Sequence, residues 1–323
     1  VLASIGYAGS LVFYNGFLPE ITTPDRMDSV SARGFTFGYI GSVILLIVNL
    51  VLLIFHDSFG FNSVTTATQF GFLLVGFWWI GFAQIAFYYL RDRPSDQKIS
   101  TKILGKGLEE LKKIADRVRQ RPTMRRYLTA FFMYSMGVST VMLLAPLFAS
   151  KEVGIGQMEM IIVVLILQIL AIFGAYFFAW LAGNRSSKLA ISTILVIWAG
   201  LCIVCFFLTA KMGFYVLAGI LGFGMGGVQS VSRSTYSRLI PKTAKDTASY
   251  FSFYELTEKS AIVIGTFAFG LINQLTGSMR LSMLFMALFF VAGFLVLQTA
   301  DLESDMKRIA EAEDLDPSDR LVV

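Results

Sequence analysis

The stretch FSFYELTEKSAIVIGTFAFG, residues 251–270, is apolar enough for a membrane helix, yet it contains Glu255, Glu258 and Lys259. A charge near the bilayer centre costs about 2.5–3.5 kcal/mol on insertion scales, so such groups face a bundle interior or an aqueous cavity. At about 100° per residue the three side chains share one helix face, and Glu255 precedes Lys259 by the four residues that favour an ion pair. The stretch therefore predicts a membrane helix with an inward polar face.

The whole chain has the composition of a membrane protein. Of its 323 residues, 55% are hydrophobic and 15% are charged, whereas about a quarter of the residues in a soluble protein are charged. Apolar runs of about 20 residues recur, and a helix of that length crosses a bilayer while satisfying its own backbone. We predict an all-α membrane protein with nine spans, near residues 1–21, 34–55, 68–90, 128–149, 158–182, 189–210, 213–238, 248–272 and 280–300.

Basic residues gather in alternate loops. The predicted loop 91–127 holds twelve Lys and Arg, whereas the loops of the opposite side hold Lys151, Lys211 and Arg280. The positive-inside rule then predicts that the basic loops and the C-terminus are cytoplasmic. The net charge of +5 is thus explained by topology and by contact with the lipid bilayer, and we expect no nucleic-acid partner.

Few residues offer catalytic or metal-binding chemistry. Cys202 and Cys205 fall inside a predicted span and are expected to be apolar fillers. The segment GILGFGMGG (219–227) lacks the preceding strand and later acidic residue of a dinucleotide site, so its glycines predict close helix packing. No P-loop, zinc site or Ser–His–Asp set is visible. We expect no enzymatic activity, no cofactor and no metal, and a monomeric protein.

Two stretches repeat within the chain. FYNGFLPEI (13–21) matches TYSRLIPKT (235–243) at its tyrosine and its proline, and the spans that follow share an aromatic–polar–aromatic pattern. Similarity in the same order predicts two parallel halves, as in transporters. In this register the first three spans correspond to the last three, so nine helices of an expected twelve are present.

This register predicts four parts. Residues 1–90 are expected to be the last three helices of an N-terminal domain, and 91–127 a cytoplasmic inter-domain loop. Residues 128–300 are expected to form a six-helix C-terminal domain, and 301–323 a cytoplasmic tail. The inter-domain loop contains an amphipathic pattern that predicts an interfacial helix at the membrane surface. Its apolar face would consist of Leu104, Leu108, Leu111, Ala115 and Val118.

The chain resembles the autophagy-related protein 22, or vacuole effluxer-like, branch of the major facilitator superfamily. The resemblance rests on FYNGFLPEI, SVSARGFTFGYIGS (29–42), FWW (77–79), QSVSRSTYSRLIPK (229–242) and SYFSFYELTEKSAIVIGTFAFG (249–270). The branch's first-helix motif, of Asp-Trp-Ala-Asn type, is absent, which fits a truncated N-terminus. The resemblance implies a secondary active transporter of a small polar solute working by alternating access, with amino-acid efflux and proton coupling as expectations, in a bacterial inner (plasma) membrane.

The candidate site residues follow from the buried charges, the repeat and the superfamily's loop motif. Arg233 is expected to pair with Glu255 or Glu258 and to gate the inner mouth. The loop-motif copy at 182–188 has Asn184 where an Asp is usual, which places its gating pair in doubt. The expected substrate and coupling residues are Glu255, Glu258, Lys259, Tyr14, Asn15, Tyr236, Gln229 and Trp78, and the expected gating residues are Arg233, Arg185 and Asn184.

Each assignment has a structural alternative. Glu255, Glu258 and Lys259, the charged trio, would equally form a salt bridge between helices. Arg233 would reach the interface as a snorkelling side chain. The tyrosines and amides would make packing hydrogen bonds, and Trp78 would face lipid. Two other function classes also stay open: a lipid-handling protein, such as a flippase or a lipid-acting membrane enzyme, and a non-transporting receptor or scaffold that uses the 91–127 loop.

Overall fold

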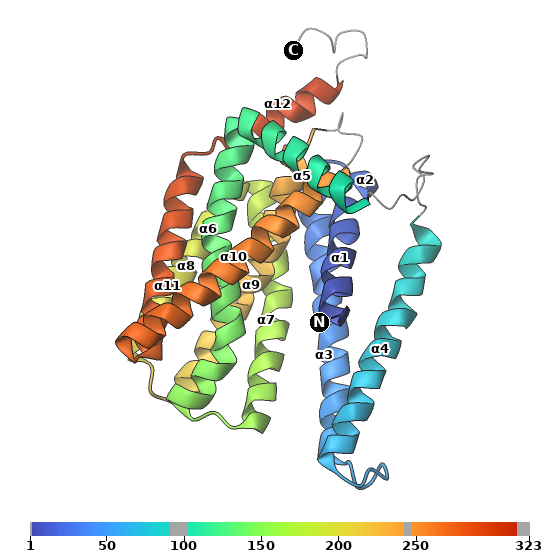
Figure 1. Cartoon of the computed structure of the whole chain (residues 1–323), viewed down its shortest axis with the longest axis vertical. Coiled ribbons are helices and arrows are strands. Elements are labelled where there is room, and N and C mark those ends of the chain that lie inside the picture. The colour runs from blue at the N-terminus through green and yellow to red at the C-terminus, as the bar shows by residue number, and fades with distance from the viewer. Residues whose placement is uncertain (1, 91–102, 242–246, 315–323) are drawn as a thin grey trace.

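The computed structural model describes residues 2–90, 103–241 and 247–314, and every regular element in these ranges is a helix (Figure 1). The elements are α1 (Leu2–Gly16), α2 (Leu18–Ile21), α3 (Met27–Ile54), α4 (Val64–Tyr89), α5 (Ile103–Gln120), α6 (Pro122–Phe148), a π-helical turn η1 (Ala149–Val153), α7 (Gln157–Asn184), α8 (Ser187–Phe207), α9 (Lys211–Leu239), α10 (Thr247–Thr276), α11 (Met279–Gln298) and α12 (Leu302–Asp314).

Seven of these helices are long and apolar enough to cross a membrane: α3, α4, α6 with η1, α7, α8, α9 and α11. The predicted first and eighth spans, now α1 and α10, lie beside them in the same bundle. The predicted fold class, an all-α, major-facilitator-like membrane protein, is confirmed. Helix length and apolar composition identify seven spans among the described residues, where nine were expected. The difference has a physical cause, because α1 has 15 residues in the described chain and α10 carries the buried charges.

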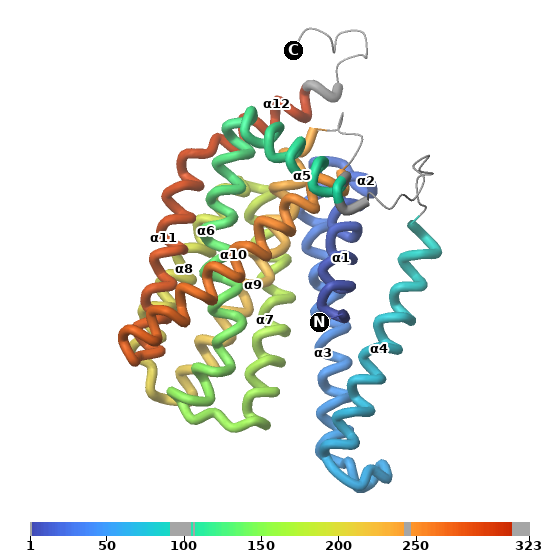
Figure 2. The backbone as a smooth tube through the Cα atoms, in the orientation of Figure 1, coloured from blue at the N-terminus to red at the C-terminus, as the bar shows by residue number. Residues whose placement is uncertain are grey.

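The helices form two groups, which Figure 2 shows side by side. We call α1, α3 and α4, which lie on one side in Figure 2, the three-helix group, and α6 to α11, on the other side, the six-helix group. The groups meet where α3 packs against α7 and α9, and where α1 packs against α10. We call the end of the bundle that carries α2, α5 and α12 the basic end, and the opposite one the far end.

Glycines bring two helices of the six-helix group into backbone contact. A Cβ at Gly222 would collide with the carbonyl oxygen of Leu167 on α7, and a Cβ at Gly226 would collide with that of Ala171. Gly174 approaches the backbone of Phe223 in the same way from α7. The glycine-rich segment 219–227 is thus a packing surface, as predicted.

Two predicted boundaries were wrong by six residues or more. The second span was expected to begin at residue 34, but α3 begins at Met27 and includes the polar segment Asp28–Arg33. The segment is helical because its polar side chains are buried against α9; Asp28 is 4% exposed and Ser31 is fully buried. The fourth span begins at Pro122 rather than 128, since proline suits the first turn of a helix.

The amphipathic helix exists as α5, and its predicted apolar face is right at Val118 and wrong at Leu108, while the side chain of Leu104 lies outside the described residues. Ile114 and Val118 are buried in the core of the six-helix group, where α5 packs on α6 and α10. Leu108, which was expected on the same face, is 64% exposed. The buried apolar side chains of α5 therefore pack against α6 and α10.

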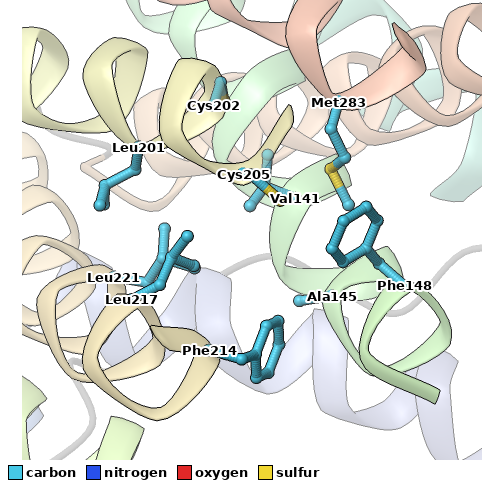
Figure 3. A pocket seen from close by; sticks show the side chains of 10 residues that line it. All are labelled: Val141, Ala145, Phe148, Leu201, Cys202, Cys205, Phe214, Leu217, Leu221 and Met283. Atoms are coloured by element: carbon cyan, nitrogen blue, oxygen red, sulfur yellow. The ribbon is translucent and has the colours of Figure 1, made fainter. Parts of the chain in front are cut away.

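The six-helix group encloses a small apolar cavity among α6, α8, α9 and α11 (Figure 3). Both cysteines line it, and both are buried free thiols. The remaining lining side chains are hydrocarbon or thioether groups such as Leu217 and Met283. This confirms that Cys202 and Cys205 serve as apolar fillers.

Candidate functional site

Arg233 of α9 is inserted into a socket made by α1 and α3, and its side chain is 3% exposed. Its Nε donates to Ser31 Oγ at 3.0 Å, and its Nη2 donates to the Ser31 carbonyl oxygen at 2.9 Å. Its Nη1 donates to Asn15 Oδ1 at 3.3 Å. The guanidinium of the six-helix group is thus bound by residues of the three-helix group.

Aromatic rings complete the socket. The guanidinium carbon lies 4.9 Å from the ring centroid of Tyr14 and 4.5 Å from that of Phe35, within the range of cation–π contacts. Gly34 makes this geometry possible, because a Cβ there would come within 2.5 Å of the Tyr14 hydroxyl and 3.1 Å of Arg233 Nη2. Any larger residue at position 34 would displace the two side chains.

Asn15 connects this socket to the charged face of α10. Its Nδ2 donates to Glu255 Oε1 at 2.9 Å, while its Oδ1 accepts from Arg233. The predicted pairing of Arg233 with Glu255 or Glu258 was therefore wrong in detail, since Asn15 stands between Arg233 and Glu255. The order Arg233–Asn15–Glu255 spans three helices from both groups.

The charged trio of α10 divides into two parts. Glu255 is 6% exposed, and its Oε2 lies 3.4 Å from Lys259 Nζ while making no hydrogen bond within the described residues. The Lys259 side chain is 40% exposed. Glu258 is half-buried, and no hydrogen bond reaches it from the described parts of the chain. Glu255 belongs to the inter-group network, whereas Glu258 and Lys259 keep free bonding capacity.

The other predicted residues lie at different distances from this network. Gln229 accepts a hydrogen bond from Tyr39 of α3 and so also bridges the groups. The ring of Trp78 of α4 packs against that of Phe82 at a tilt of 47° and lies near Gly41 of α3. Trp78 therefore contributes to packing within the three-helix group.

Three predicted residues do not reach the network. Tyr236 is fully buried in the six-helix group, where its hydroxyl donates to the Tyr250 carbonyl oxygen at 2.8 Å and its ring stacks on Tyr254. Asn184 and Arg185 are exposed at the turn between α7 and α8, and Asn184 donates to the Trp180 carbonyl oxygen of its own helix. The packing alternative thus describes Tyr236.

An ion pair that sequence reasoning missed closes the same interface nearer the basic end. Asp28 of α3 accepts from Arg238 and from Ser234, both on α9. Arg238 also donates to Ser187 Oγ at the start of α8. The sequence predicts a loop at Asp28, and the signal that could have found the ion pair was an acidic residue six positions before the aromatic segment that begins at Gly34.

The α9 segment 230–237 is unusually polar for a membrane helix, and it contacts α6 as well as α3. Ser230, Ser232, Ser234, Thr235 and Ser237 are each at most 2% exposed. Thr235 and Ser237 leave their hydroxyls without a hydrogen-bond partner in the described part of the chain. Buried polar groups without partners destabilise the arrangement that buries them.

Solved structures of transporters, among them a major facilitator superfamily member, share this arrangement of helices. The fucose transporter FucP in its outward conformation superimposes with a TM-score of 0.63 at 16% identity, covering 90% of this chain and 72% of that one. A bacterial homologue of the iron transporter ferroportin in its outward-facing state gives 0.53 at 13% identity, covering 96% of this chain and 71% of that one. The fold is therefore that of this superfamily.

The chain belongs to the family described as vacuole effluxer Atg22 like, which matches residues 1–310. The MFS-type transporter YxiO of Bacillus subtilis is 29% identical, over 97% of this chain and 73% of that protein. Autophagy-related protein 22 of Eremothecium gossypii is 27% identical, over 93% of this chain and 61% of that protein. These findings confirm the family resemblance and make the chain an integral membrane protein of a transporter family.

Proposed function

We propose that the protein is a secondary active transporter that moves a small polar solute by alternating access, seen here closed at its basic end. The observation that carries this proposal is the Arg233 socket, in which a charged side chain of one helix group is held entirely by polar and aromatic groups of the other.

The polarity of this interface favours reversible contact. Permanent interfaces resemble a protein core, whereas transient ones keep more polar surface. Here the inter-group contacts include the Asn15–Glu255 bond, the Tyr39–Gln229 bond and the Ser234–Asp28 bond. When the basic end opens, water can satisfy all of these groups, so opening is less costly than for an apolar interface.

Charges of both signs at the centre support a polar solute. Lys259 lies on the helix face of Glu255 and Glu258, so the trio carries one surplus negative charge when both acids are ionised. A cationic group of the solute, or a coupling proton on Glu258, would neutralise that charge. A zwitterion such as an amino acid fits Glu258 and Lys259 together. FucP is described as a fucose:proton symporter, which is consistent with proton coupling as a proposal.

The charge distribution supports a cytoplasmic basic end. Exposed arginines of α5 and α6 lie there, whereas Arg280 and Lys211 of the far end are paired with Glu152 and Glu159. By the positive-inside rule we assign the basic end and α12 to the cytoplasm, in a bacterial inner membrane, with the protein acting as a monomer.

Transport in proteoliposomes tests the proposal. The chain, with any sequence that naturally adjoins it, is reconstituted and supplied with labelled amino acids, sugars and organic cations, with and without a pH gradient. We expect saturable flux of one solute class and loss of gradient dependence in Glu258→Gln. A Glu159→Gln variant, which changes a carboxylate at the far end, should transport normally. Full gradient-driven flux in Glu258→Gln and Lys259→Met would overturn the assignment of these residues.

A further inference from the structure

One flank of α5 faces away from the bundle and forms no ion pair within the described residues. At about 100° per residue, Leu108, Lys112 and Arg119 point within about 40° of one another. Their mean direction lies about 120° from that of the buried Ile114 and Val118. All three flank residues are exposed, and Leu108 is 64% exposed. The flank therefore combines two cations with an uncovered leucine.

The first turn of α6 extends this flank. Arg125 is exposed, and its Nη1 donates to the carbonyl oxygen of Arg119 at 3.4 Å, which places the two arginines next to each other. α6 begins at Pro122 and continues as a membrane-spanning helix. The cations of Arg119 and Arg125 thus lie where a membrane helix emerges from the bilayer, at the level of lipid headgroups.

The positive charge of this flank is not compensated. Among the described residues, the acids of α5 that form ion pairs, Glu109 and Glu110, both bind Lys113, at 3.3 Å and 2.8 Å. Lys113 lies on the other side of the helix, together with Arg117. No ion pair within the described ranges includes a cation of the flank. Asp116, the remaining acid of α5, lies about 60° from the mean direction of the flank and forms no ion pair with it among the described residues.

We propose that Leu108, Lys112, Arg119 and Arg125 form a binding site for the phosphate headgroup of an anionic lipid. Arginine presents a planar fork that matches phosphate oxygens, and lysine adds a point charge. An exposed leucine beside them enters the acyl boundary, as in interfacial helices. Because α5 packs on α10, which carries the charged trio, a lipid bound here contacts the element attached to the transport site.

Two matched double variants test this site. Lys112→Gln/Arg119→Gln removes two charges from the flank, and Lys113→Gln/Arg117→Gln removes two charges from the opposite side of the same helix. Each protein is purified in detergent, and its thermal midpoint is measured with phosphatidylglycerol, with phosphatidylcholine and with glycerol phosphate. The midpoint without added lipid reports whether each variant is folded.

We expect phosphatidylglycerol to raise the thermal midpoint of the parent and of the control variant, but not of the flank variant. Loss of two interfacial charges corresponds to about 30-fold weaker apparent lipid affinity. Equal losses in the two variants would overturn the site in favour of diffuse attraction. Stabilisation by glycerol phosphate alone would show a soluble-anion site instead of a lipid site, and no stabilisation by phosphatidylglycerol in the parent would also overturn the proposal.

Discussion

Arg238 of α9 donates from Nη2 to Oδ1 of Asp28 of α3 at 2.7 Å, and this ion pair joins the two helix groups next to the basic end. The same nitrogen donates to Ser187 Oγ of α8 at 2.8 Å, so a third helix helps to orient the guanidinium. The Asp28 side chain is 5% exposed and that of Arg238 is 15% exposed. Removing one partner from a buried pair leaves an uncompensated charge, which costs about 3–5 kcal/mol.

Asp28→Asn is therefore expected to open the basic end. A reporter cysteine at Ser230, whose carbonyl accepts from Ser31 across the interface, is placed in a Cys202→Ala/Cys205→Ala background. We expect a membrane-impermeant maleimide added from the basic side to label it at least tenfold faster in Asp28→Asn. Glu152→Gln breaks the Arg280 pair inside the six-helix group and should leave labelling unchanged. An unchanged rate in Asp28→Asn would show that this pair does not hold the interface closed.

Arg233→Lys is expected to reduce transport nearly as much as Arg233→Gln. The guanidinium makes three hydrogen bonds and two ring contacts in a fixed plane, and an ammonium group cannot reproduce that set. We expect transport to fall at least tenfold in both variants while Arg280→Lys, at the far end, keeps its flux per folded molecule. Initial flux in proteoliposomes checks this, and wild-type flux in Arg233→Lys would contradict the role of the socket.

Asn15 and Glu255 are expected to act as one unit. Residues in one hydrogen-bond network show coupling energies of about 0.5–3 kcal/mol in double-mutant cycles. We expect Asn15→Ala, Glu255→Gln and the double variant to raise reporter labelling at Ser230 by similar factors, so that the single effects do not add. Tyr236→Phe, which alters a hydroxyl inside the six-helix group, should add fully to either change. Additive effects of Asn15→Ala and Glu255→Gln would show that the bond between them is incidental.

The sequence singled out those candidate site residues whose burial is energetically costly. Glu255, Glu258 and Lys259 stand out because charges inside an apolar run are costly unless they face an interior. The repeat also drew attention to helices of this site, since α1 matches α9 and α3 approximates α10, and the observed inter-group contacts include α1 with α10 and α3 with α9. Asn15 was found through the repeat, one residue from the matched tyrosine.

The parts of the site that the sequence did not predict depend on contacts between residues far apart in the chain. Asp28 and Arg238 are 210 positions apart, and the polar segment that begins α3 has the composition of a loop. Nothing local distinguishes a solvated loop from a helix whose polar groups are buried against another polar helix. For the same reason the pairing of Arg233 with Asn15 and Ser31 could not be predicted, although Arg233 itself was.

The contact between α7 and α9 gives a stability prediction that is independent of transport. A methyl group at Gly226 would overlap the backbone carbonyl of Ala171, which cannot rotate away, whereas Gly38 and Gly270 have no atom within 4 Å of an added Cβ. Gly226→Ala is expected to destabilise by about 1–3 kcal/mol, as overpacking does. Gly38→Ala should be neutral or stabilising by up to about 1 kcal/mol, because alanine restricts the unfolded chain and favours helix. Thermal midpoints of the purified variants in detergent measure both effects, and equal midpoints would show that the close approach of α7 and α9 is not required for stability.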